Sequence, residues 1–374
     1  MKKSVLFLSA ATLLLSVFAC TEKEDNATAN PAAFLTDNEQ KAMVGTLKDI
    51  ADGHLYSMDY TADYKLNELM ASGGAKSNTE LTLKILGSLL DIPSTKADAG
   101  LDFGCSAFCV KSPEGDVLVG RNFDYRFVSS ANVLVHNKAC REHESFCISS
   151  LPYLDKDVYV AGSLSDGKTD VSIPAVASIY CCLDGMNDAG LFICVLSLRE
   201  GGAWQDDPTK GNIMPSTAMR IALDSCTTVN QAVEVFRNHN FYADGKTSEA
   251  NYHFLIADAS GKAAVVEYIR PENDWVMNVV NADHVTNFYL SEGWQHIGVG
   301  QARYDSLHTT LERKNRIMTM DECMDLLDVV HTDLNSEGGE ITSNTQWSVV
   351  YNLTKKTGIV CVEKDYSNRI PFSL

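Results

Sequence analysis

Several patterns that would indicate a metal, a nucleic acid or a repeat architecture are missing from this sequence. There is no Cys-x-x-Cys pair, and no two histidines have the spacing of metal ligands, so we predict no metal site and no cofactor. Basic residues are outnumbered, 31 Lys and Arg against 49 Asp and Glu, and the net charge of −18 argues against nucleic acid as a partner. Internal repeats and low-complexity segments are absent as well. An acidic surface of this kind is ordinary and identifies no substrate.

The composition is that of a globular protein with ample core. Of the 374 residues, 45% are hydrophobic and 21% are charged, which does not fit a disordered chain. The length suits one large domain or two ordinary ones.

The long apolar run lies at the N-terminus. Lys2 and Lys3 precede an apolar stretch from Val5 to Ala19, which is too short for a comfortable membrane span and is typical of a secretory signal. Cys20 follows a small residue, as in bacterial lipoprotein signals, where this cysteine carries the lipid. The alternative is an ordinary signal peptide with an incidental cysteine. We therefore predict an exported lipoprotein at the outer membrane of a Gram-negative bacterium, on its periplasmic or surface face.

The cysteines are numerous for an exported chain. Eleven are present, and setting aside Cys20 and Cys105 leaves an odd number, so not all can pair internally. A local disulfide between Cys140 and Cys147 is one candidate. We expect the cysteines in apolar strand-like runs to be buried as small hydrophobic residues, namely Cys181, Cys182 and Cys194.

The chain divides into four parts. Residues 1–20 are the signal, 21–35 form a polar tether, 36–104 form a helical pro-segment, and 105–374 form the main domain. Within the pro-segment, Thr36-x-x-Glu39 and Ser77-x-x-Glu80 have the capping-box pattern ahead of apolar residues. This predicts two or three helices over residues 36–92, followed by an exposed loop from 93 to 104.

From Cys105 onward the pattern becomes that of an α+β domain. Cys105–Lys111 and Asp116–Gly120 predict a hairpin, and the last two strands predict another. Further strands are expected at Asn132–His136, Val158–Ala161, Ser178–Cys182, Leu191–Ser197, His253–Ala257, Ala263–Tyr268, Trp275–Val280, His284–Leu290, Trp347–Leu353 and Gly358–Glu363. Helices are expected at Pro215–Ser225, Val229–His239, Ala302–Thr310 and Met320–His331. This order suggests helices that cover both faces of packed sheets.

The first hairpin carries a candidate nucleophile. Cys105 begins its first strand, and Arg121 and Asp124 lie just past the second, so both can come close to Cys105. The charge of Arg121 would favour the thiolate form of the cysteine. Asp124 would hold a free α-amino group by hydrogen bonding, or simply pair with Arg121.

A free N-terminal amine would complete this site. No histidine lies near Cys105 in the sequence, whereas the α-amino group of a cleaved Cys105 has a pKa of about 7.7–8.0 and would act as its base. Gly104 tolerates strained geometry and suits attack by the thiol on the peptide bond before Cys105. Cleavage between Gly104 and Cys105 is therefore predicted.

These residues resemble a family of linear-amide hydrolases, the choloylglycine hydrolases, which includes bile salt hydrolases and penicillin V acylases. The resemblance covers roughly residues 104–362. It rests on Gly104-Cys105, Gly120-Arg121-Asn122-Phe123-Asp124, Asp184-Gly185-Met186-Asn187, His253-Phe254-Leu255 with Val265-Val266-Glu267, Thr286-Asn287 and Gln301-Ala302-Arg303-Tyr304. We expect Asn187 to serve the turn of its own motif.

The resemblance implies a fold and further site residues. The fold would be the four-layer αββα sandwich of the N-terminal-nucleophile hydrolases. Asn287 would help to form the oxyanion hole, and Arg303 would be a second active-site arginine. Ser197 falls where bile salt hydrolases carry a second oxyanion asparagine. The long pro-segment is similar to that of acid ceramidase and N-acylethanolamine amidase, relatives that keep the cleaved segment bound.

The function predicted from the sequence is hydrolysis of linear N-acyl amides through a Cys105 thioester. The substrates would be small molecules of the bile-salt, N-acyl amine or penicillin V type. Two alternatives stay open: a catalytically silent, lipid-anchored binding protein on the same fold, and acyl transfer to an amine. Homotetramers occur in the family, so a homo-oligomer is a further expectation.

Overall fold

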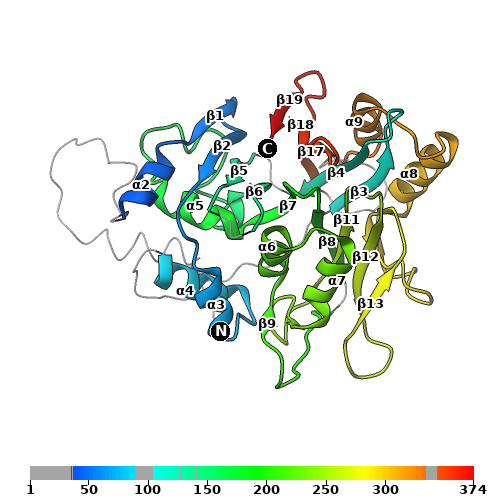
Figure 1. The fold of residues 1–374 in the computed structure, drawn as a ribbon, viewed down its shortest axis with the longest axis horizontal. Helices are drawn as coiled ribbons and strands as arrows, with labels where there is room; N and C mark the ends of the chain where they lie inside the picture. The colour runs from blue at the N-terminus through cyan, green and yellow to red at the C-terminus, as the bar shows by residue number, and fades with distance from the viewer. Residues whose placement is uncertain are drawn as a thin grey trace, which may run out of the picture.

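Two large β-sheets pack face to face and enclose most of the core (Figure 1). The structure is a computed structural model that describes residues 35, 37–89, 104–126, 129–139, 142–199, 201–333 and 343–374. Cys20, the tether residues 21–34 and the loop 93–103 lie outside the described residues, as does Thr36. Nothing below concerns their structure.

The larger sheet has nine strands. Adjacent strands are antiparallel, except for β2 and β5, which run parallel over six residue pairs. In spatial order they are β1 (Lys48–Ala51), β2 (Leu55–Tyr60), β5 (Asn132–Asn137), β6 (Ser145–Ser150), β7 (Cys182–Asn187), β8 (Phe192–Arg199), β11 (Ala250–Ala257), β12 (Ala263–Ile269) and β13 (Val276–Val280).

The second large sheet has six antiparallel strands and carries the N-terminal end of the main domain. Two short pairs complete the strands, β9 (Asn212–Ile213) with β10 (Asn240–Phe241), and β15 (Asn287–Phe288) with β16 (Gly298–Val299). The six strands are, in spatial order, β14 (His284–Val285), β3 (Gly104–Lys111), β4 (Val117–Tyr125), β17 (Asn344–Asn352), β18 (Thr357–Val362) and β19 (Ile370–Ser373).

Helices cover the outer face of each sheet, which confirms the predicted four-layer αββα sandwich (Figure 1). The nine-stranded sheet is covered by α6 (Pro215–Ser225) and α7 (Val229–Arg237), and the six-stranded sheet by α8 (Gln301–Arg313) and α9 (Met320–Val329). Helix α9 shows why these segments are helical. The Thr319 hydroxyl caps it by accepting from the Glu322 amide, and the apolar residues that follow recur on one buried face, namely Cys323, Met324, Leu326 and Leu327.

The pro-segment is not purely helical, which corrects the sequence-based prediction. It contains α2 (Asn38–Val44), α3 (Leu66–Ala71) and α4 (Asn78–Leu89), but residues 48–60 form the β1–β2 hairpin. The hairpin turns at Asp52 and Gly53, whose φ angles of 47° and 83° are both positive. An Asp-Gly pair is a strong signal for such a turn, and the sequence reading overlooked it.

The same hairpin joins the pro-segment to the main domain. Because β2 pairs with β5, the pro-segment supplies the edge of the nine-stranded sheet. Its side chains enter the common core, and the hydroxyl of Tyr60 donates to the carbonyl oxygen of Val176 at 2.9 Å. Buried residues on β2 and just after it are Leu55, Tyr56, Met58, Tyr60, Ala62 and Tyr64.

Two predicted strands of the main domain are absent. Residues 158–161 lie in turns, and 178–180 form a 3₁₀ helix, η2 (Ser178–Tyr180), that follows α5 (Ser172–Ala177). Elements that were not predicted are helix α5, strands β6, β9, β10, β16 and β19, and a second 3₁₀ helix, η1 (Leu151–Tyr153); β7 shares only Cys182 with a predicted strand. Short elements carry little periodicity, so packing decides their state.

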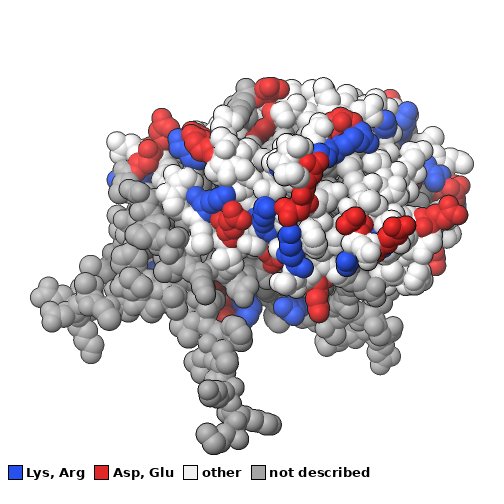
Figure 2. Space-filling view, turned by 90° about the horizontal axis from the view of Figure 1, so that it is seen from below, with Lys and Arg blue, Asp and Glu red and all other residues white. Residues whose placement is uncertain are grey.

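One face of the molecule can be compared with the overall acidic charge. On the face shown in Figure 2, acidic and basic side chains are interspersed despite the net charge of −18. Over the residues that the structure describes, every helix is too short or too polar to cross a membrane.

Candidate active site

The main chain of Cys105 is the point where distant parts of the sequence meet. Cys105 is fully buried near the start of β3. Its amide N–H donates to Oδ1 of Asn287 at 2.6 Å, and its carbonyl oxygen accepts from Nη1 of Arg303 at 2.6 Å. Two residues proposed from the sequence, both far from Cys105 along the chain, therefore contact the candidate nucleophile directly.

Arg303 ties these contacts together from the first turn of α8. Its Nη1 also donates to Oγ of Ser106 at 2.7 Å, and its Nη2 donates to Oδ1 of Asn287 at 2.9 Å. The helix begins after Gly300, whose φ of 93° suits glycine. A Cβ at residue 300 would lie 2.8 Å from Nη2 of Arg303, so the close approach also requires a glycine there.

Arg121 does not pair with Asp124, so one of the two roles considered for Asp124 is wrong. The ladder between β3 and β4 places Arg121 opposite Ala107. Its Nε donates to Oδ2 of Asp184 at 2.8 Å, in an ion pair whose side chains are both fully buried. The nearest cation that pairs with Asp124 is Arg303, at 3.6 Å between Nη1 and Oδ2.

Burial is the main influence on the pKa of the Cys105 thiol in the continuous chain. Desolvation raises the pKa of Cys105 to about 11, the positive charge of Arg121 acts in the opposite direction, and the nearby Asp124 carboxylate raises it further. The thiol is therefore held mainly protonated near neutral pH, and attack on a carbonyl requires a base or a change in its surroundings.

Asp124 presents an unsatisfied oxygen next to Gly104. Its Oδ1 accepts from the hydroxyl of Thr345 at 2.6 Å, while its buried Oδ2 has no hydrogen-bond partner among the residues that the structure describes. Burial raises the pKa of this carboxyl, and the charge of Arg303 opposes the rise. In the ladder Asp124 lies directly opposite Gly104. This oxygen faces the Arg303 cation at 3.6 Å, beyond hydrogen-bond distance, and can accept a hydrogen bond from a further polar group.

The glycine at position 104 is required by space. A Cβ at this position would lie 2.9 Å from Oγ of Ser343 and 3.3 Å from Cβ of Asp124. Gly104 lies in the extended strand β3 and is not among the glycines with positive φ. The sequence-based interpretation was that glycine is present here because it tolerates strained geometry, whereas the structure shows close packing around this position.

Asn287 and Ser197 are also in contact. Nδ2 of Asn287 donates to the main-chain carbonyl oxygen of Ser197 at 2.9 Å. Ser197 thus orients Asn287 through a backbone acceptor in β8. Because its Oδ1 accepts from Cys105 and Arg303, any side-chain hydrogen bond that Asn287 offers to an oxyanion must come from Nδ2.

Two further groups support the site and were not assigned roles from the sequence. Asp184 accepts from Arg121 and also from Trp347 Nε1 at 3.0 Å and Tyr351 Oη at 2.5 Å. The second group is the buried pair of His253 and Glu267. All three residues stand in the motifs named above, but a motif does not reveal which side chains touch. Asn187, as expected, serves its own turn by accepting from the Leu191 amide.

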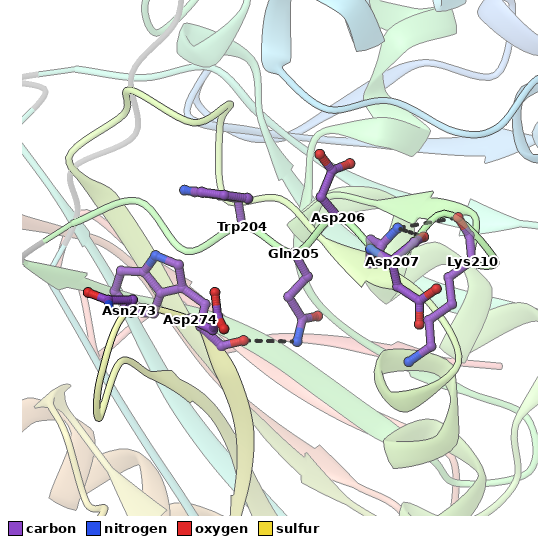
Figure 3. A pocket seen from close by; sticks show the side chains of 9 residues that line it. Trp204, Gln205, Asp206, Asp207, Lys210, Asn273 and Asp274 are labelled. Atoms are coloured by element: carbon purple, nitrogen blue, oxygen red, sulfur yellow. Dashed lines mark hydrogen bonds between the residues drawn. The ribbon is translucent and has the colours of Figure 1, made fainter.

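The structure also contains a pocket of about 330 Å³ (Figure 3). Trp204 and Trp275 form part of it, and none of the predicted catalytic residues lines it. Asp206 in its wall is held by Lys76 of the pro-segment and by Lys246, at 3.1 and 2.7 Å. Among the described residues, no cluster of three or more His, Cys, Asp or Glu side chains is arranged to hold a metal ion.

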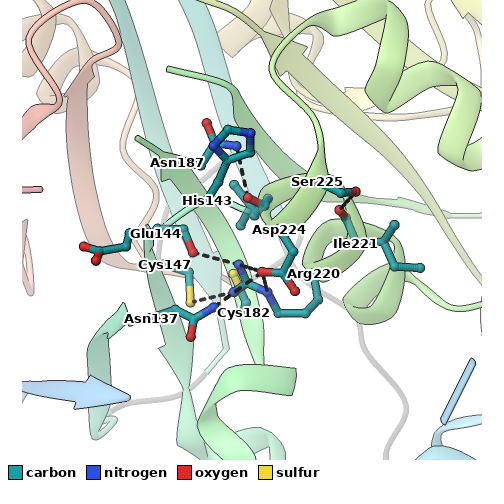
Figure 4. A network of polar contacts seen from close by, with 12 residues as sticks. Asn137, His143, Glu144, Cys147, Cys182, Asn187, Arg220, Ile221, Asp224 and Ser225 are labelled. Carbon is teal, nitrogen blue, oxygen red and sulfur yellow. Dashed lines mark hydrogen bonds and ion pairs between the residues drawn. The ribbon is translucent and has the colours of Figure 1, made fainter. Parts of the chain in front are cut away.

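A second polar network lies under α6 (Figure 4). Arg220 forms a buried ion pair with Asp224 at 2.7 Å, and Asp224 accepts from the hydroxyl of Tyr64 in the pro-segment at 2.6 Å. Arg220 also approaches the Cys147 sulfur at 4.0 Å. Cys147 is a buried free thiol, which contradicts the candidate disulfide; Cys140 lies outside the described residues. Cys182 and Cys194 are buried free thiols as predicted, whereas Cys181 is only partly buried.

Comparison with known proteins agrees with this geometry. Residues 105–279 match the model of the linear amide C–N hydrolases, choloylglycine hydrolase family, and the match begins at Cys105. Over 189 residues the chain is 23% identical to a penicillin V acylase from Pectobacterium atrosepticum. That alignment covers 48% of each protein, so the chain spans about half the length of the curated relative it matches.

A solved structure shows the same fold. The chain superimposes on a variant of the conjugated bile acid hydrolase from Clostridium perfringens with a TM-score of 0.50 and 15% identity, covering 72% of this chain and 92% of that one. At this identity the likeness concerns the fold alone. The chain therefore has the fold of the N-terminal-nucleophile hydrolases, and the match to the family model is confined to residues 105–279.

Proposed function

We propose that this protein is a self-processing cysteine amidohydrolase that cleaves small linear N-acyl amides. The observation that carries the proposal is the convergence on Cys105 of Asn287, Arg303 and a carboxylate with an unsatisfied oxygen. Such a carboxylate is suited to receive the ammonium group that appears when the bond between Gly104 and Cys105 is cut. The substrate class follows that of the family, with bile-salt, N-acyl amine and penicillin V-like amides as candidates.

The proposed reaction transfers the acyl group in two steps. The Cys105 sulfur attacks the amide carbonyl while the Cys105 α-amine takes the thiol proton and gives it to the leaving amine. Water then attacks the thioester, which releases the carboxylic acid and restores the thiol. Arg121 would favour the thiolate by its charge, and Nδ2 of Asn287 would donate a hydrogen bond to the oxyanion. Loss of such a donor typically slows a reaction about 100–1000-fold.

For maturation we propose an intramolecular version of the first step, followed by hydrolysis. The Cys105 sulfur attacks the Gly104 carbonyl, the peptide bond to Cys105 breaks, and the thiol proton passes to the departing nitrogen, which becomes the α-amine; water then hydrolyses the thioester to Gly104 and restores the thiol. The Cys105 nitrogen is still an amide in the continuous chain and cannot be the base, so water or another group must carry this proton. The cleaved pro-segment would stay bound, because β2 is hydrogen-bonded to β5 and its apolar side chains lie in the common core.

Intact mass under denaturing conditions tests self-processing. Protein expressed from residue 21 should yield a fragment that begins at Cys105, whereas the Cys105→Ala variant should stay one chain and show no turnover on a panel of the three substrate types. Cys105→Ser should mature slowly and lose most activity, because a serine alkoxide is much harder to form. Hydrolysis that persists in Cys105→Ala would refute the nucleophile. An unbroken, inert parent chain would favour the silent binding protein.

Membrane attachment is proposed separately. The N-terminal signal supports a lipid at Cys20 and export to the outer membrane of a Gram-negative cell. Labelling with a clickable fatty acid in such a host should mark the parent and not Cys20→Ser, and the label should fractionate with outer membranes. Equal labelling of both proteins would refute the anchor.

A further inference from the structure

A buried pair of ionisable side chains lies beside the site without touching Cys105. His253 on β11 and Glu267 on β12 are both fully buried, and Nδ1 of His253 lies 3.2 Å from Oε1 of Glu267. Taking two such groups out of water is costly, and good geometry with further hydrogen bonds is needed to offset that cost. The partners of this pair therefore indicate what it does.

The partners all belong to the segment 286–291. Nε2 of His253 faces the carbonyl oxygen of Thr286 at 2.7 Å, and since a carbonyl can only accept, this nitrogen is the donor. Glu267 accepts from the Leu290 amide at 2.8 Å, and from the amide and hydroxyl of Ser291 at 3.0 and 2.5 Å. Burial would raise the pKa of Glu267, but the hydrogen bond and charge of His253, together with the hydrogen bonds from Leu290 and Ser291, hold it below its usual value.

The pair therefore hydrogen-bonds this segment at both ends, and Asn287 lies between the two sets of contacts. Thr286 directly precedes Asn287, and the second set of contacts begins at Leu290. The segment leaves the six-stranded sheet after β14, while His253 and Glu267 belong to the nine-stranded sheet. Asn287 itself lies in the two-residue strand β15, paired with β16 apart from the two large sheets. So short a pairing fixes a side chain poorly without outside support.

We propose that His253 and Glu267 are positioning residues that hold Asn287 in place over Cys105. Their hydrogen bonds set the main chain on either side of Asn287, and so the direction of its amide toward the reacting carbonyl. A displacement of about 1 Å in such a group can cost about 100-fold in rate. The inference rests on the proposed function, in which Asn287 supplies the oxyanion contact.

Glu267→Gln is the informative substitution. Glutamine keeps the shape, but its NH₂ group must face the donors that now bind the carboxylate. With the best substrate of the panel, we expect kcat to fall about 10–100-fold while KM changes less than about 3-fold, because the contact acts in the transition state. Glu249→Gln, the same change at an exposed position just before β11, should leave both constants unaltered. A rise in KM with kcat unchanged, or an equal fall in kcat in the Glu267→Gln and Glu249→Gln variants, would overturn the proposal.

A double-mutant cycle asks whether the pair acts through Asn287. If it does, Glu267→Gln should cost little further activity once Asn287→Ala is present, since the group being positioned has gone. If the fold-loss of activity in the double variant equals the product of the two single fold-losses, Glu267 acts independently of Asn287, and this result would overturn the inference.

Amide hydrogen exchange tests whether the pair holds residues 286–291 in place, and it does not require turnover. In the Cys105→Ala chain, which we expect to stay uncleaved, Glu267→Gln should speed amide exchange in peptides covering residues 286–291, and Glu249→Gln should not. Exchange that is unchanged in this segment would refute the positioning role. If the parent protein shows no turnover, the proposed function fails, and the exchange result alone then decides whether the pair holds the segment.

Discussion

Replacing Asp184 by asparagine would remove one charge from a fully buried ion pair at nearly constant volume. In the folded protein, Asp184 accepts from Nε of Arg121 at 2.8 Å, from the indole of Trp347 at 3.0 Å and from the hydroxyl of Tyr351 at 2.5 Å. Neither Asp184 nor Arg121 is exposed to solvent. The asparagine keeps one acceptor oxygen, but places an NH₂ group where the second oxygen received a donor.

The expected cost in stability is large. Removing one member of a buried ion pair typically destabilises a protein by about 3–5 kcal/mol, because the remaining charge is left uncompensated. Arg121 keeps a hydrogen bond to the Val195 carbonyl oxygen at 2.9 Å, which favours the lower end, about 3 kcal/mol. Total unfolding free energies are about 5–15 kcal/mol, so this is a substantial fraction.

Urea unfolding of uncleaved chains would measure this cost. Both substitutions would be made in the Cys105→Ala background, so that each variant unfolds as one chain. Tyr351→Phe is the matched comparison, since it removes a single hydrogen bond to the same carboxylate and should cost about 1.5–3 kcal/mol. If Asp184→Asn cost less than about 1 kcal/mol, or less than Tyr351→Phe, the interpretation of a stabilising, charge-compensated Arg121 would be refuted.

Three further results are expected. Gly104→Val should slow self-cleavage about 100-fold, as followed by mass spectrometry, because a side chain there collides with Ser343 and Asp124. Self-cleavage should accelerate about tenfold per pH unit from neutral pH toward the pKa of Cys105 at about 11, since only the deprotonated thiol attacks; a flat rate profile would refute the thiolate. After cleavage, the pro-segment should co-elute with the main domain in gel filtration. Tyr64→Phe should lower the urea concentration at which the pro-segment is released, because it removes the hydrogen bond from the Tyr64 hydroxyl to Asp224, worth about 1.5 kcal/mol.

Helices α6 to α9 were predictable because each has a one-sided apolar pattern and a recognisable start, whereas the six-residue α5 was not. Pro215–Ser225 was predicted with its observed bounds, and α7 ends two residues before the predicted His239, within the usual uncertainty of helix ends. The hairpin of β3 and β4 was predictable from alternating apolar runs around a turn. Local sequence suffices for such elements because their hydrogen bonds close over short distances.

The pro-segment strands could not be derived from periodicity. Residues 48–51 and 55–60 are short, and their extended state depends on pairing with β5, which lies beyond the proposed cleavage site. The Asp52-Gly53 turn was the local signal available, and apolar residues at helical spacing in the preceding stretch obscured it. Tertiary pairing outweighs weak local preference in segments of this length.

The site residues could be predicted from the sequence, but their contacts could not. The motifs indicated which residues gather, namely Cys105, Arg121, Asp124, Asn287 and Arg303. They did not indicate that Arg121 pairs with Asp184, or that Arg303 bonds the main chain of Cys105. The partner of a buried charge depends on which strands face one another across the two sheets, and no spacing along the chain records that.

From the sequence alone came the class of fold, the candidate nucleophile and the bond proposed for cleavage, because each depends on residue type and local order. Only the tertiary structure decided that Gly104 is needed for space, that Asp124 keeps an oxygen without a hydrogen-bond partner, and that His253 and Glu267 grip the segment around Asn287. These features arise where two sheets and a short loop come within hydrogen-bonding distance. Such distances are set by the packing of the whole core.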